Sequence, residues 1–420
     1  MVLRDVCNLR ATLRNIRFIR ASLRTTDLLG GRAHRTSEFF AREERAGLGG
    51  SMSEQGDADQ DASREPTRTS FRARTSSGAS QPIDRRDARK TDAVKLAARA
   101  ILILLVVLGH NRIFHDHLYY TGYIIVYSFH VGSFFLLATF GKPRPLNRKT
   151  FAGMWRSFLW PYVIFTAIYG SLFFVSEFAK GKVDPLTWAA RFMLALPLGT
   201  SPMLDAATGL KMLWFLPAFF VFCIFYNCYG TADRKLKIAI VAGTCVAHLG
   251  LPTVPRSVLA MAPLGSAIAA YLLLPALIFM QLRCLEWRGK LIAVNAAVFA
   301  ISSLALIHFR LESVLAEYRI FGIETPLDMI ISDAALISGA GAVVSVARVI
   351  WQSRAAQWIG ARSLQIYLIH APINLVMVTL CKHMTLWPLA IGIASIGTVI
   401  VTCLAIFIME RTRVAKFIFG

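Results

Sequence analysis

Ten blocks of mostly apolar residues follow one another between residues 93 and 408. Most of them are close to the length of about 20 residues that an α-helix needs to cross the hydrocarbon core of a bilayer. Backbone groups in lipid must be hydrogen-bonded within their own segment, so such blocks fold as helices. The sequence therefore predicts an all-α fold, a polytopic integral membrane helix bundle of about ten transmembrane helices. The expected spans are 93–113, 121–141, 157–177, 210–229, 237–252, 257–280, 290–308, 328–348, 362–381 and 386–408.

Two apolar segments are short for a membrane span. Residues 237–252 are the shortest of the ten blocks and the weakest of the expected spans. Residues 186–199 are too short to cross a bilayer, so we expect them to lie at the membrane interface or to re-enter it.

The loop charges predict the orientation of these spans. The formal net charge of +21 would indicate nucleic-acid binding in a soluble protein. Here most of the Lys and Arg residues of the loops lie in 142–156, 230–237, 281–290, 349–361 and the C-terminal tail. Because positive loops stay on the cytoplasmic side, we expect both termini in the cytoplasm and a plasma (bacterial inner) membrane location. The expected surroundings are membrane lipids, and no nucleic-acid partner is expected.

The first 90 residues differ in composition from the rest and are expected to form a disordered basic tail. Within residues 1–30, arginines recur at steps of three or four with Leu and Ile between them. This pattern suits a membrane-surface helix, a targeting peptide, or upstream DNA translated from a misassigned start within 1–51. We expect the membrane domain to cover residues 91–410 and a short cytoplasmic tail to cover 411–420.

The first span carries two ionisable residues, Arg99 and His110, in the stretch RAILILLVVLGH. Eleven helical steps return to within roughly 20° of the starting face, so both side chains share a face about 16 Å apart along the axis. Ionisable groups within spans are costly and are candidates for function. Arg99 could instead extend to the lipid headgroups, and His110 could be a neutral residue that bonds neighbouring helices.

A second histidine and a basic segment add to this pair. His130 lies near the middle of the second span, and imidazole is the natural general base at neutral pH. Arg148, Lys149 and Arg156 precede the third span on the expected cytoplasmic side. They are either ordinary topology signals or a clamp for a phosphorylated ligand.

The seven cysteines are scattered along the chain, and their spacing does not match a zinc or redox motif. We therefore expect no metal site, no disulfide framework and no bound cofactor.

Five segments occur in an order that resembles the integral-membrane acyltransferase-3 family. They are RAILILLVVLGH (99–110), SFHVGSFF (128–135), WRSFLWPYVIF (155–165), LWFLPAFF (213–220) and SLQIYLIH (363–370). The resemblance covers roughly residues 90–410. Its most specific element is an Arg or Lys, ten residues and then a His in the first helix, which Arg99 and His110 match.

The chain departs from the family pattern at two places. Gly132 and Ser133 follow soon after His130 where the family usually has Pro and aromatic residues. The Arg-x-x-Arg before the Pro-Tyr of the third span is incomplete, because Gly153 stands three residues before Arg156. Arg148 or Lys149 could substitute for the missing arginine.

The resemblance implies transfer of an acyl group, most often acetyl, from cytoplasmic acyl-CoA to a hydroxyl of a cell-surface or exported glycan. Acetyl-CoA would be the donor substrate, bound by Arg99 and Arg156. His110 would be the general base, and His130 would orient it or polarise the thioester carbonyl.

Trp214 and His370 also match family positions and are candidates for an acceptor path, whereas Ser363 and Tyr367 are expected to be structural. Two other functions stay open, a glycan or lipid transporter (flippase) and a sensor or scaffold with an arginine-rich tail. Scarce acidic residues within the spans and the missing inverted repeat argue against transport. The sequence specifies neither an acceptor sugar nor an oligomeric state.

Overall fold

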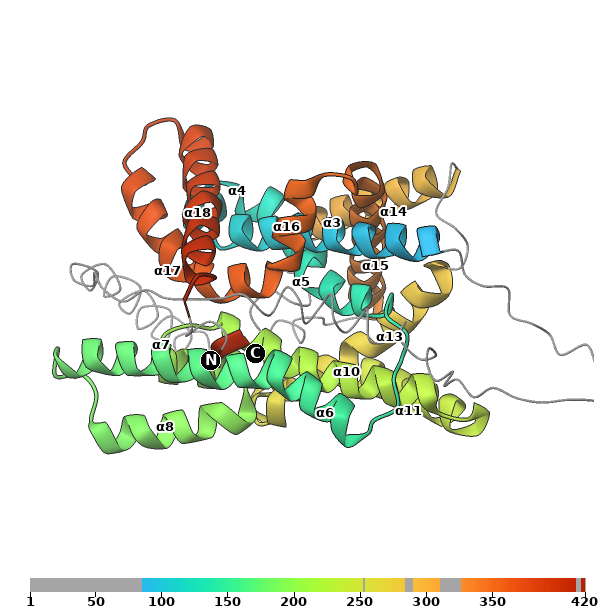
Figure 1. Ribbon diagram of the computed structural model, residues 1–420, viewed down its shortest axis with the longest axis horizontal. Coiled ribbons are helices and arrows are strands. Elements are labelled where there is room, and N and C mark those ends of the chain that lie inside the picture. Colours follow the sequence, from blue (N-terminus) through green and yellow to red (C-terminus); the bar gives the residue numbers. More distant parts are fainter. Residues whose placement is uncertain (1–84, 252–253, 284–289, 310–325, 413–416, 420) are drawn as a thin grey trace, which may run out of the picture.

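The computed structural model describes residues 85–251, 254–283, 290–309, 326–412 and 417–419, and every regular element within them is a helix (Figure 1). Of the disordered tail expected over 1–90, residues 1–84 lie outside the described residues, and residues 85–90 belong to the first helix. The α-helices are α3 (Arg85–Gly109), α4 (Arg112–Leu118), α5 (Ile124–Ala138), α6 (Arg148–Met154), α7 (Trp160–Phe178), α8 (Pro185–Leu198), α9 (Ser201–Thr208), α10 (Phe215–Thr231), α11 (Arg234–Gly250), α12 (Arg256–Ala260), α13 (Ser266–Arg283), α14 (Lys290–His308), α15 (Pro326–Ile350), α16 (Arg354–Ala361), α17 (Ser363–Cys381) and α18 (Trp387–Met409). Two π-helices, η2 (Tyr119–Tyr123) and η3 (Trp155–Leu159), and two 3-10 helices, η4 (Met212–Trp214) and η6 (Pro263–Gly265), join some of them.

Seven helices of the described residues are long and apolar enough to cross a membrane, and the bent pair of α3 and α4 would make eight. The count of ten spans is therefore not confirmed. The block at 237–252 lies in α11, which has 17 residues, and the block at 290–308 contains a shorter apolar helix, Ile292–His308. The all-helical membrane bundle itself is confirmed, and the protein is an integral membrane protein.

Helix α18 shows how the bundle meets lipid. Ile396, Ile400 and Leu404 stand four residues apart, so they lie on one face of the helix, and each is more than half exposed. Thr398 and Thr402, on another face, are fully buried. A helix that turns its aliphatic side chains outward and its polar ones inward is arranged for a hydrocarbon environment.

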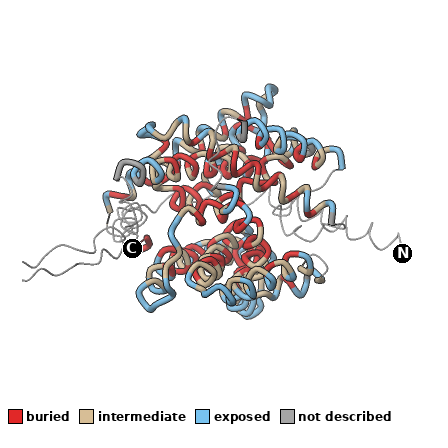
Figure 2. The backbone as a smooth tube through the Cα atoms, turned by 90° about the vertical axis from the view of Figure 1, so that its right-hand side faces the viewer, coloured by how far each residue is buried: buried red, intermediate tan, exposed pale blue. Residues whose placement is uncertain are grey.

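The helices form two groups, visible one above the other in Figure 1. One group holds α3, α4 and α14 to α18, and the other holds α7, α8, α10 and α11. Helix α5 contacts α3 and α15 of the first group, and it also contacts α10 and α13. Phe135 of α5 stacks edge to face on Phe215 and Phe222 of α10, so a buried aromatic core joins the two groups. Buried residues fill the inside of both groups in Figure 2.

The first expected span is broken where its apolar run ends. Helix α3 ends at Gly109, α4 begins at Arg112, and their axes differ by 75°. Asn111 causes the break, because its extended backbone makes it the N-cap of α4 and its Oδ1 accepts from the amide of Ile113 at 2.9 Å. Its Nδ2 donates to the carbonyl of Ile391 and to Oγ of Ser395 on α18. The bend is therefore fixed to a neighbouring helix.

Candidate functional site

Three histidines from three segments lie around the end of α3, and we call them the histidine cluster: His110, His130 and His370. The rings of His110 and His370 meet edge to face, with centroids 5.1 Å apart. His130 comes from α5 and His370 from α17. His110 is close enough to act electrostatically on both of the others. The structure thus brings together three sequence candidates that lie up to 260 residues apart.

Each ring of the cluster is held by the same kind of hydrogen bond. Nδ1 of His110 lies 2.8 Å from the carbonyl oxygen of Val106, and Nδ1 of His130 lies 2.7 Å from that of Val126. Nδ1 of His370 lies 2.8 Å from the carbonyl oxygen of Tyr367. A carbonyl oxygen only accepts, so each neutral ring donates from Nδ1 and keeps the lone pair on Nε2. All three rings therefore present a basic Nε2.

The three histidines differ in access. His110 is exposed, whereas His130 and His370 are fully buried. Within the described residues, Nε2 of His130 and Nε2 of His370 have no hydrogen-bond partner. An incoming hydroxyl can reach His110 from outside the bundle. In this tautomer neutral His130 accepts a hydrogen bond and does not donate one, which suits orienting a proton-carrying group better than polarising a carbonyl.

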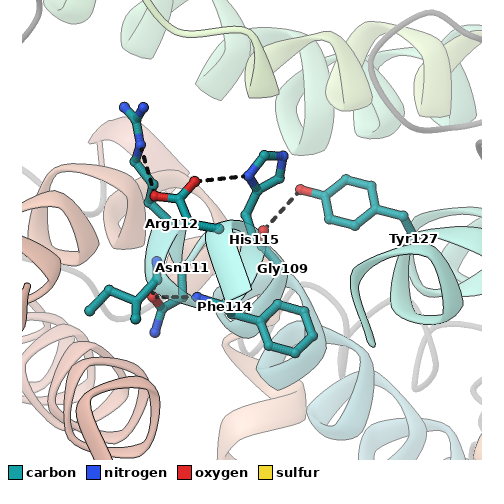
Figure 3. Close-up of polar contacts among 8 residues, drawn as sticks. Gly109, Asn111, Arg112, Phe114, His115 and Tyr127 are labelled. Carbon is teal, nitrogen blue, oxygen red and sulfur yellow. Dashed lines mark hydrogen bonds and ion pairs between the residues drawn. The ribbon is translucent and has the colours of Figure 1, made fainter. Parts of the chain in front are cut away.

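Tyr127 connects His130 to the segment that carries His110. Its hydroxyl donates to the carbonyl of Gly109 at 3.3 Å, and Figure 3 shows the side chain reaching toward that residue. Its ring meets the ring of His130 edge to face at 4.6 Å. The sequence analysis did not single out Tyr127. Tyr127 lies three residues before His130 and therefore on the same helical face, and this spacing could have identified it from the sequence.

A narrow cavity of about 60 Å³ runs along α3 beside the cluster, and we call it the Arg99 cavity. Its wall is almost entirely aliphatic and aromatic, with Arg99, Ser363 and Tyr367 as its polar members. The lining residues are Arg99, Ile103, Val106, Val131, Phe134, Leu137, Ala138, Phe158, Phe215, Phe219, Ser363, Leu364 and Tyr367. Ser363 and Tyr367, expected to be structural only, thus belong to this wall.

One residue that lines the Arg99 cavity also contacts His110. Val106 lines the cavity, and the carbonyl of the same residue accepts from Nδ1 of His110. Seven helical steps separate Arg99 from Val106, which is about 10 Å along the axis. A cation, an apolar slot and a basic nitrogen therefore follow one another along α3.

The remaining sequence candidates lie at different distances from this cavity. Arg156 is exposed in η3, two residues before the cavity residue Phe158. Trp214 packs edge to face on Phe215, which lines the cavity. Arg148 and Lys149 are exposed in the first turn of α6 and are not part of the lining. Of the four, Trp214 contacts a residue that lines the cavity, and Arg156 is near the lining residue Phe158 only in sequence.

Comparisons with curated proteins and with solved structures give no match. A family model described as an acyltransferase domain, that of the acyltransferase-3 family, matches residues 97–408. The match covers well over half of the chain and includes Arg99, the whole histidine cluster and every residue that lines the cavity. The chain is thus a member of the acyltransferase-3 family and a membrane acyltransferase.

Proposed function

We propose that this protein transfers an acyl group, most often acetyl, from cytoplasmic acyl-CoA to a hydroxyl group of a cell-surface or exported glycan. One observation carries the proposal: Val106 both lines the Arg99 cavity and holds the ring of His110. The cavity therefore leads from a cation that suits the donor to a base that suits the acceptor.

The donor end of the cavity fits the chemistry of coenzyme A. Arg99 is half-buried in the wall, and a guanidinium binds phosphate oxygens in pairs. Arg156, near Phe158, supplies a second cation at the surface. The slot between Arg99 and Val106 is narrow and apolar, as a thioester arm requires. The basic loops at 142–156 and elsewhere support a plasma (bacterial inner) membrane location with this end and both termini in the cytoplasm.

At the acceptor end, Nε2 of His110 takes the proton from the acceptor hydroxyl. The hydroxyl oxygen attacks the thioester carbonyl carbon, the new ester C–O bond forms, and the C–S bond breaks. The CoA thiolate leaves and receives the proton from the His110 imidazolium. His130, through its buried Nε2, orients a hydrogen-bond donor of the reacting groups, and His370 positions the ring of His110 through their edge-to-face contact.

The transfer is tested by measuring base-labile acyl ester on the surface and secreted glycans of the host. One host strain carries a deletion of the gene. Three others carry the wild-type protein, His110→Ala or His308→Ala at matched membrane levels. His308 is an exposed histidine at the end of α14 and serves as the matched control. We expect ester only with the wild type and His308→Ala. Full activity of His110→Ala would refute the role of His110, and unchanged ester in the deletion strain would refute a surface-glycan acceptor.

A further inference from the structure

A second pocket, separate from the Arg99 cavity, lies beside α4, and we call it the α4 pocket. Its volume is about 500 Å³, and it is open to the surface. Ile113, Asp116 and His117 of α4 form one wall. Lys382 and His383, which follow the end of α17, form the other. It is far wider than the Arg99 cavity, so it has room for a ligand the size of a sugar.

Helix α4, which carries one wall of the α4 pocket, is fixed to α18. Asn111 at the start of α4 donates to Ile391 and Ser395 of α18. The ring of His117 stacks on Trp387, the first residue of α18, at 5.3 Å and nearly parallel. The wall that α4 contributes is therefore held in place against α18.

The charge available in the α4 pocket is positive. The carboxylate of Asp116 is already engaged, by Arg112 at 3.7 Å and by Nδ1 of His115 at 3.2 Å, and Figure 3 shows both of these side chains. The side chains of Lys382 and His383 are exposed and form no hydrogen bond or ion pair with the described residues. An ammonium group without a partner in a polar pocket attracts a carboxylate or a phosphate.

The α4 pocket also lies near the proposed base. Ile113 of its wall follows His110 by three residues, so their Cα atoms are at most roughly 11 Å apart. A bound saccharide of one or two rings spans that distance. An acceptor whose anionic group lies at Lys382 would thus bring a hydroxyl to Nε2 of His110.

We propose that the α4 pocket is the acceptor-binding site and that it selects saccharides with an anionic group close to the acylated hydroxyl. The inference rests on the proposed function, since it assigns the acceptor of the same reaction. The anionic group is a carboxylate or a phosphate of the saccharide.

The test measures binding to the full chain in nanodiscs of zwitterionic phosphatidylcholine. The probes are trigalacturonic acid, which is anionic, its neutral methyl ester, and mannose 6-phosphate. The variants are Lys382→Gln and His383→Gln, with Lys235→Gln on α11 as a matched control that also removes one exposed positive charge. His110→Ala is included because it removes the base and leaves the pocket intact.

We expect one of the two anionic probes to bind at least about tenfold more tightly than the neutral ester, as one charged contact provides. Lys382→Gln should abolish that preference, and Lys235→Gln and His110→Ala should keep it. Equal binding of charged and neutral probes, or a preference that survives Lys382→Gln, overturns the inference. A repeat in nanodiscs with phosphatidylglycerol tests the lipid alternative, since loss of probe binding there would make the pocket a headgroup site. Because binding is measured without acyl transfer, failure of the proposed transfer would be seen separately in the ester assay.

Discussion

The ring of His370 meets the ring of His110 edge to face, with centroids 5.1 Å apart and an interplanar angle of 82°. Such an edge-to-face arrangement is the favoured geometry for aromatic neighbours. His110 is exposed and follows the last residue of α3, so little else on its own helix fixes it beyond the bond to Val106. We infer that His370 positions His110 through its ring.

His370→Phe should keep most of the activity, because phenylalanine preserves the ring contact. It also removes a buried Nε2 that has no hydrogen-bond partner within the described residues, so thermal stability should not fall. His370→Ala removes the ring and should lower kcat at least about tenfold with little change in KM for the donor. Kinetics of both variants in nanodiscs check this. An equal loss of kcat in His370→Phe and His370→Ala would show that the enzyme needs Nε2 of His370 and not the ring contact.

Asn111 caps the N-terminus of α4 and also hydrogen-bonds to α18. Asn111→Ala should destabilise the protein by about 1–2 kcal/mol through loss of the cap alone. Loss of the bonds to Ile391 and Ser395 should also free the bend and lower transfer. Asn111→Ser keeps an oxygen for the cap and should retain more of the stability than of the transfer. Thermal unfolding and ester formation, measured on the same preparations, separate the two effects. A stable and fully active Asn111→Ala protein would contradict the assigned role.

The contact between Gly109 and Tyr127 leaves no room for a methyl group. A Cβ at residue 109 would lie 2.8 Å from Cε2 of Tyr127, so the ring would have to move away from its hydrogen bond to Gly109 and its ring contact with His130. We expect Gly109→Ala to lower transfer strongly. Gly392→Ala on α18 is the control, because no atom lies within 4 Å of its Cβ position and alanine favours a helix. An active Gly109→Ala protein would mean that the Tyr127 contact is dispensable.

The sequence predicted the helices well because each apolar block carries its own signal, independent of the rest of the chain. It also placed Arg99 and His110 on one face, and the amide of His110 still bonds the carbonyl of Val106 as a helical residue does. The 75° break was missed because the block 93–113 is long enough for one continuous span, although Asn111 before Arg-Ile-Phe is a recognisable N-cap signal. The contact of His370 with His110 and the cavity wall at Ser363 and Tyr367 depend on how α17 packs against α3. Packing of that kind has no local sequence pattern.

Buried His248 of α11 pairs with partly buried Asp333 of α15, outside the histidine cluster. Nε2 of His248 is 2.8 Å from Oδ2 of Asp333, and Nδ1 lies 3.0 Å from the carbonyl oxygen of Tyr271. Asp333→Ala should cost about 3 kcal/mol, because it strands a buried polar ring. The double variant His248→Leu/Asp333→Leu should recover most of that loss. Thermal unfolding of the single and double variants gives the coupling free energy between His248 and Asp333. Additive losses would show that the pair contributes no interaction energy.

Acid should stop transfer if Nε2 of His110 is the base. A protonated imidazole has no lone pair to accept the hydroxyl proton, so kcat/KM should fall as the pH is lowered. The rate should level off at higher pH, since the neutral base is then fully populated. His110→Ala should leave only a slow rate without this fall at low pH, whereas His308→Ala should reproduce the wild-type profile. The measurement is initial-rate release of CoA thiol, followed between about pH 5 and 8 in nanodiscs. A wild-type profile that stays flat across this range would assign proton removal to a group other than a histidine.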